Sequence, residues 1–206
     1  MTDPAGGPPP TPQGSDNWQA PPPPAPGGFQ PAPPAPGPAP GVVYADTVTR
    51  VIAYIIDAII FFIVAVFIVG ILILAIFTGG GIVALIGTVV LAAISIGGSA
   101  VYFIYTWTRM RASLGQRALG LETVNAADGA TLTQEQAIRR WAFLFGPTAL
   151  GAALGYAPGS LGILGSLVGL LAFVYELYLL YTVTQSPKRQ GYHDVQAGTV
   201  VVKRVG

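Results

Sequence analysis

The sequence has no cysteine, one histidine and few charged residues. Without cysteine the chain has no disulfide framework, no thiolate metal site and no cysteine nucleophile. Only 9% of the residues are charged and the net charge is +1, so no broad positive field attracts nucleic acid. His193 stands without other metal ligands, and no serine–histidine–aspartate spacing indicates hydrolysis. We therefore expect no enzyme, no catalytic residue, no metal and no cofactor.

Proline is scarce outside the first part of the chain, where it is abundant. Residues 1–40 hold 16 of the 19 prolines, and residues 1–49 contain no lysine or arginine. A segment of this composition buries too little apolar surface to fold. We expect residues 1–44 to form a disordered tail and residues 45–206 to form a membrane domain. Recruitment of a protein partner by the tail belongs to the alternative in which the protein is a non-transporting scaffold. No basic segment precedes an apolar run, so we expect no signal peptide.

Two long blocks lack charge almost completely. The 51 residues from Ala58 to Thr108 carry none, and the 43 residues from Trp141 to Val183 carry only Glu176. A membrane span requires about 20 apolar residues, so each block is long enough for two. Turn residues near the middle of each block, at 79–81 and 158–159, predict a hairpin.

The predicted fold is an all-α integral membrane protein with four transmembrane helices in two hairpins. The expected helices cover residues 49–77, 82–107, 136–156 and 160–184, with a loop at 109–135 and a tail at 185–206. The basic residues precede the first helix, lie around the loop or follow the last helix. The positive-inside rule then places the loop and both termini in the cytoplasm.

The loop has local signals for ordered structure. Asp128-Gly129 is a turn signal between residues 121–124 and 130–132, and Thr133 to Gln136 fits a capping box that opens the third helix. Residues 198–202 have strand character because they are rich in β-branched side chains. We expect the strand segments of the loop and of the tail to pair.

Two acidic residues interrupt the apolar helices. Asp57 follows Arg50 by seven residues, which places it about 10 Å along a helix on nearly the same face. Glu176 precedes Thr184 by eight residues, about 12 Å from the same side of the membrane. Both acids therefore reach a similar depth. A carboxylate in hydrocarbon must be paired, protonated or hydrated, so both should face the bundle interior.

Two interpretations of these acids remain open. In the first, Asp57 and Glu176 line a shared proton or cation site, with tyrosine hydroxyls as partners and Arg50 as a competing countercharge. In the second, Asp57 pairs with an arginine and only fixes the packing of the helices. The supporting side chains in these two interpretations are Tyr54, Tyr175, Tyr178, Arg139 and Arg140.

Small residues recur at spacings that let helices approach closely. Gly151 and Gly155, and likewise Gly165 and Gly169, are four residues apart. This approach can occur within the bundle or between protomers. Four spans leave little room for an alternating-access pathway in one protomer. A transport role therefore predicts a homo-oligomer, a dimer through these glycine faces.

Four segments together carry a family resemblance. Residues 50–57 read RVIAYIID and residues 113–121 read SLGQRALGL, while residues 137–140 read AIRR and residues 189–201 read RQGYHDVQAGTVV. They resemble, in this order, the opening helix, the loop, the entry to the next helix and the closing segment of the RDD family of bacterial membrane proteins, which is named for one arginine and two aspartates. The proline-rich tail is similar to that of mycobacterial proline-rich antigens.

The resemblance covers residues 45–203 and implies that Arg50, Asp57 and Asp194 are the signature residues. Glu122 departs from the family pattern, where a basic residue is common. The resemblance also implies a bacterial cytoplasmic membrane, and transport of an unidentified ligand, with ion or proton exchange proposed for some members. We expect transport of a small ion or solute, with Asp57 as titratable centre and Arg50, Glu176 and Asp194 as further site residues. The alternative is a non-transporting scaffold.

Overall fold

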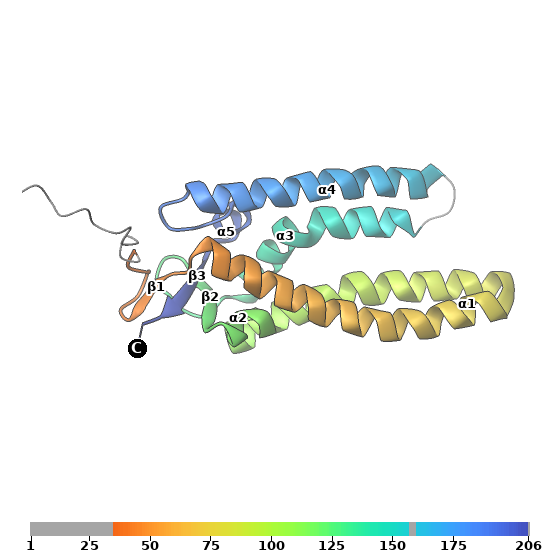
Figure 1. Cartoon of the computed structure of the whole chain (residues 1–206), viewed down its shortest axis with the longest axis horizontal. Helices are drawn as coiled ribbons and strands as arrows, with labels where there is room; N and C mark the ends of the chain where they lie inside the picture. The colour runs from red at the N-terminus through yellow and green to blue at the C-terminus, as the bar shows by residue number, and fades with distance from the viewer. Residues whose placement is uncertain (1–34, 157–159, 206) are drawn as a thin grey trace, which may run out of the picture. The chain divides into compact units, whose positions relative to one another are not determined.

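The long apolar block that begins after residue 46 is helical and doubles back. The computed structural model describes residues 35–156 and 160–205, and its helix α1 runs from Thr47 to Tyr105. A straight helix would place Asp57 and Tyr102 about 67 Å apart. The Tyr102 hydroxyl nevertheless donates a hydrogen bond to Asp57 Oδ1 at 2.8 Å. The two arms of α1 therefore lie side by side (Figure 1), as the predicted first hairpin requires.

The reversal itself differs from the prediction. The backbone stays helical through residues 79–81, so the expected boundary between helices at residues 77 and 82 is not present in α1. Asp46 caps the first turn, because its side chain accepts a hydrogen bond from Thr49 N at 2.8 Å. Beyond Tyr105 the chain continues as a π-helical turn, η1, from Thr106 to Met110. Arg111 then leaves the helix in a left-handed conformation with φ of 59°.

The segment between the two hairpins is ordered. Helix α2 covers Leu114–Ala118 and strand β2 covers Leu121–Asn125. Thr133 and Gln136 form the predicted capping box, with hydrogen bonds of 3.2 Å and 3.1 Å in the two directions. That part of the sequence prediction is confirmed. Helix α3 begins at this cap and runs over Gln134–Gly155.

A small sheet lies at one end of the helices, so the all-α class was incomplete. Strands β1 (Val42–Tyr44) and β2 both pair antiparallel with β3 (Thr199–Arg204), in the order β1-β3-β2. The predicted pairing of the loop and tail strands is confirmed. Strand β1 was not predicted because three residues after a proline-rich run give no alternation to recognise. Ordered structure therefore begins before residue 45, whereas residues 1–34 lie outside the described part.

The last part of the chain folds back onto the sheet. Helix α4 covers Ser160–Gln185 and packs along α3, while α5 covers Tyr192–Ala197 (Figure 1). The ends of α3 and α4 lie within two residues of the predicted ones, and the predicted turn at 158–159 is outside the described residues. The expected tail at 185–206 is instead a structured element, because α5 and β3 occupy most of it.

The glycine faces are used inside the chain. A Cβ added to Gly165 would overlap the backbone of Gly155, and one added to Gly151 would lie 2.9 Å from Gly169 N. The glycines therefore bring α3 and α4 into contact with each other. This is a contact within one chain, the first of the two arrangements that the glycine spacing allows.

Three described helical segments are long and apolar enough to cross a membrane. They are Thr47–Ile68, Val89–Met110 and Ser160–Gln185. Helix α3 is not among them, since Arg139 and Arg140 lie in its first turns and Pro147 in its interior. The fold is thus mostly helical with three candidate spans, and apolar side chains such as Phe62, Phe67 and Leu171 point away from the protein as a lipid-facing surface requires.

Candidate functional site

A buried carboxylate holds two arginines from distant parts of the chain. Asp194 is completely buried at the start of α5. Its Oδ2 atom accepts from Arg50 Nη1 at 3.0 Å, and its Oδ1 atom contacts Arg140 Nη1. Arg50 also donates to the Val201 carbonyl in β3 at 3.1 Å. One carboxylate therefore ties α1, α3 and α5 together beside the sheet.

Neutral groups complete the hydrogen bonding of Asp194. The Thr199 hydroxyl accepts from Arg140 at 2.7 Å and donates to Asp194 at 3.1 Å. Gly191 N donates to the other carboxylate oxygen at 3.1 Å. Gly198 ends α5 with φ of 64°, a conformation that glycine adopts without steric cost, and so turns the chain directly into β3. The short helix α5 thus places the Asp194 carboxylate in contact with both arginines.

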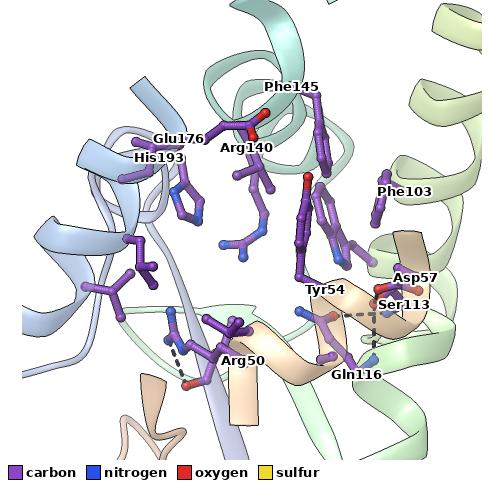
Figure 2. A pocket seen from close by; sticks show the side chains of 18 of the residues that line it. Arg50, Tyr54, Asp57, Phe103, Ser113, Gln116, Arg140, Phe145, Glu176 and His193 are labelled. Atoms are coloured by element: carbon purple, nitrogen blue, oxygen red, sulfur yellow. Dashed lines mark hydrogen bonds between the residues drawn. The ribbon is translucent and has the colours of Figure 1, made fainter. Parts of the chain in front are cut away.

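Beside this cluster is a cavity of about 260 Å³. Side chains from α1, η1, α2, α3, α4, α5 and β3 line it, and most of them are apolar. Figure 2 shows Asp57 and Ser113 on one side of Tyr54, with Arg140, Glu176 and His193 on the other. The polar residues of the lining are Arg50, Tyr54, Asp57, Ser113, Gln116, Arg140, Glu176 and His193.

Asp57 is 3% exposed and has only neutral hydrogen-bond partners among the described residues. Its Oδ1 atom accepts from the Tyr102 hydroxyl at 2.8 Å and from Gly115 N at 2.9 Å. Its Oδ2 atom accepts from the Ser113 hydroxyl at 2.5 Å. A carboxylate offers about four acceptor positions, so one remains on Oδ2. Among the described residues, no arginine lies within ion-pair distance of Asp57.

The loop that holds Asp57 is itself held in place. The side chain of Gln116 accepts from Ser113 N and from the Thr123 hydroxyl, both at 3.0 Å. This capping box fixes the start of α2, so that Ser113 and Gly115 point toward α1. A Cβ on Gly115 would overlap the Ala53 carbonyl oxygen and lie 3.0 Å from Asp57 Cγ. Only glycine lets the loop approach the carboxylate this closely.

Glu176 lines the same cavity from α4 but does not contact Asp57. Its Oε1 atom accepts from the Thr148 hydroxyl of α3 at 2.7 Å. Tyr54 stands between the two acids (Figure 2), and its ring stacks with Phe145 at 6.2 Å between centroids. The two acids thus share one cavity, as the first interpretation of the sequence predicts, from opposite walls.

His193 contributes a neutral side chain. Burial lowers its pKa well below the ordinary 6.5, and the nearby charges of Arg140 and Arg50 lower it further. Its Nε2 atom lies 3.6 Å from Asp194 Oδ2. Since the imidazole is uncharged at neutral pH, the two arginines are the cations of this cluster. Among the described residues no group of three acidic or histidine side chains forms a metal site.

The remaining predicted side chains lie elsewhere. Arg139 is exposed and pairs with Glu135 at 2.9 Å, four residues before it in α3. Tyr175 donates to the Phe143 carbonyl at 2.8 Å, and its ring lies 6.4 Å from that of Tyr178. These three side chains do not belong to the cavity lining. Of the supporting residues, only Tyr54 and Arg140 reach the site.

The geometry can be compared with known families. The RDD family model matches residues 44–198, most of the described chain and more than half of the whole. The chain belongs to the RDD family. No match was found among curated proteins or among solved structures. Arg50 and Asp194 meet directly in an ion pair, while Asp57 stands apart from them on the cavity wall.

Sequence reasoning missed several residues of the RDD site. Ser113, Gly115 and Tyr102 hold Asp57, and Thr199 connects Arg140 to Asp194. Ser113 and Gly115 stand in the loop segment that carries the family resemblance, which was a signal for a role. Nothing local marks Tyr102, because its partner is 45 residues away along the chain.

Proposed function

We propose that this RDD protein crosses a bacterial cytoplasmic membrane four times and moves a small ion or solute through the cavity, with Asp57 as the titratable centre. The observation that carries the proposal is the environment of Asp57. It is a buried carboxylate in a helix with the composition of a span, it lines a cavity, and its hydrogen-bond partners among the described residues are all neutral. Buried acids of this kind mark ion and proton pathways in membrane proteins.

The chemistry of the site supports exchange. Asp57 accepts three hydrogen bonds and keeps one acceptor position on Oδ2 for a proton or a cation. A proton and a cation compete for the same negative charge, so binding of one favours release of the other. Arg50 is held by Asp194 and is thereby kept from neutralising Asp57 as an internal countercharge.

The packing of α3 supports a fourth span. Helix α3 lies along α4 over most of its length, and the glycine contacts hold the two together. Arg140, one of the two arginines that reduce the apolar character of α3, is buried against Asp194 and so is not offered to lipid. With four spans both termini lie on one side, which the positive-inside rule makes the cytoplasm. Oligomerisation would then use surfaces other than the α3–α4 contact.

A second candidate function is a membrane scaffold, and strand β1 favours it. The proline-rich segment leads directly into Val42–Tyr44, which pairs with β3, and β3 holds Arg50 through the Val201 carbonyl. A partner bound to residues 1–34 would therefore act on the sheet that contacts the site. In this alternative the charged residues only hold the helices together.

Proteoliposomes separate the two functions. The expected result is proton movement driven by a sodium or potassium gradient, above the rate of empty liposomes, measured with an internal pH dye. A variant that lacks residues 1–34 should keep this flux, because β1 and the site remain complete. If the full chain gives no flux with any cation, transport is wrong. If the full chain shows no flux and the deletion abolishes binding of a partner, the scaffold function is favoured.

A further inference from the structure

The cavity is larger and more apolar than a bare metal ion requires. Its volume of about 260 Å³ equals roughly nine water molecules at about 30 Å³ each. A hard cation needs about six oxygen ligands close together. The oxygens of Asp57 and Glu176 lie instead on opposite walls, separated by Tyr54 (Figure 2). The space between them is bounded by hydrocarbon and aromatic side chains.

The charged side chains at and beside the cavity sum to one net negative charge. Arg50 and Arg140 are the two cations, and both are bound to Asp194. Asp57 and Glu176 add two more carboxylates, and each has a hydroxyl partner. Asp194 lies outside the lining but is bound to both arginines, so with the carboxylates ionised these five groups together carry one net negative charge. A monovalent cation would balance the site, whereas an anion would increase the imbalance in a region of low dielectric.

Aromatic rings form much of the wall. Phe103 stacks on Phe145 at 4.6 Å and lies 5.1 Å from Trp107, and Tyr54 stacks on the other side of Phe145. The face of Trp107 already holds the Arg140 guanidinium at 4.9 Å, so this wall accepts a delocalised cation. Phe173 adds a fifth ring from α4.

The opening of the cavity lies between two candidate spans. The lining residues with large exposed fractions are Tyr54 on α1 (44%) and Phe173, Leu177 and Leu180 on α4 (57%, 52% and 40%). Both helices have the length and composition to cross a membrane. A ligand that enters here comes from the side of the bilayer, so it must dissolve in lipid at least in part.

We propose that the cavity binds a monovalent organic cation with an apolar body, a protonated amine or a quaternary ammonium, which enters from the bilayer between α1 and α4. The cationic group lies between Asp57 and Glu176 beside Tyr54, and the apolar body lies against the aromatic wall. This inference rests on the proposed function and names the substrate class of the same site.

Three probes of nearly the same shape test the charge requirement. Radiolabelled benzyltrimethylammonium is equilibrated with the protein in nanodiscs, and empty nanodiscs give the background. Neopentylbenzene replaces the nitrogen by carbon and is neutral, while benzylsulfonate has a tetrahedral anionic group. We expect saturable binding of the cation, and competition at least tenfold weaker from the neutral and anionic probes, which corresponds to about 1.4 kcal/mol. Equal competition by the neutral probe, or stronger competition by the anion, overturns the proposal.

Matched variants place the bound cation. Glu176→Gln removes one charge and is expected to weaken binding of benzyltrimethylammonium about tenfold. Phe173→Ala removes an aromatic ring and is expected to weaken it about threefold, in the range of a cation–π contact. Glu135→Gln removes an exposed acid that pairs with Arg139 on the surface and does not belong to the lining, so it should leave binding unchanged. Binding that is insensitive to both Glu176→Gln and Phe173→Ala contradicts the assignment.

The outcome can be separated from that of the proposed function. Proton flux driven by sodium or potassium without binding of benzyltrimethylammonium would leave transport standing and refute the organic-cation assignment. Saturable binding of the probe without any proton flux would support the assignment and refute ion-coupled transport.

Discussion

Replacing Asp194 by asparagine is expected to lower the free energy of unfolding by about 3–5 kcal/mol, because it leaves two buried guanidinium groups without their shared anion. The side chain of Asp194 is fully buried, and those of Arg50 and Arg140 are 11% and 4% exposed. The amide accepts from one arginine at most and presents hydrogens to the other. Thermal unfolding in detergent, together with the yield of protein extracted from membranes, measures the effect.

Two comparisons make the Asp194 prediction specific. Glu135→Gln removes an acid from an exposed ion pair and should cost less than about 1 kcal/mol. Combining Asp194→Asn with Arg140→Leu removes one of the repelling charges, so the double variant should be less destabilised than the sum of the single changes. The expected loss for Asp194→Asn is at least about 3 kcal/mol. A free energy of unfolding within about 1 kcal/mol of wild type would contradict the role given to this cluster.

Gly115→Ala has the second large expected effect. The added Cβ would overlap the Ala53 carbonyl oxygen and press on the carboxyl carbon of Asp57, so α2 must move away from α1. That movement breaks the hydrogen bonds from Ser113 and Gly115 to the carboxylate. We expect destabilisation of about 3 kcal/mol, at the upper end of the overpacking range, and loss of any function that depends on Asp57.

Gly98→Ala is the matched control for this substitution. It also replaces a helical glycine, in α1, but a Cβ there meets no atom within 4 Å. Alanine is the better helix former by about 1 kcal/mol, so Gly98→Ala should be neutral or stabilising. Both variants are measured by thermal unfolding in the same detergent. Similar melting temperatures for the two would show that the approach of α2 to α1 is not tight.

The sequence predicted what local signals determine. The ends of α3 and α4, the capping box at Thr133 and the pairing of β2 with β3 all follow from charge-free runs, capping residues and β-branched stretches. Membrane association of the RDD type likewise follows from apolar length and from the family motifs.

The sequence named Arg50, Asp57, Glu176 and Asp194, but the contacts among the site residues could not be predicted, because they join residues far apart in the chain. Arg50 and Asp194 are separated by 144 residues, and Ser113 and Asp57 by 56. In the sequence, Asp194 stands in a short polar stretch that reads as a turn, and only the packing of α5 under α1 and α3 buries it. The glycine pairs showed that helices approach closely, but spacing alone does not say whether the partner is the same chain.

The central claim is that Asp57 carries the ion coupling, and the most direct test compares Asp57→Asn with wild type in proteoliposomes. The asparagine keeps the shape of the side chain and can still accept from Ser113 or Gly115, so the loop should stay in place. Proton flux driven by a cation gradient is expected to fall to the level of empty liposomes for Asp57→Asn. The Glu135→Gln variant is expected to retain the flux. Equal flux from wild type and a folded Asp57→Asn protein would contradict the central claim.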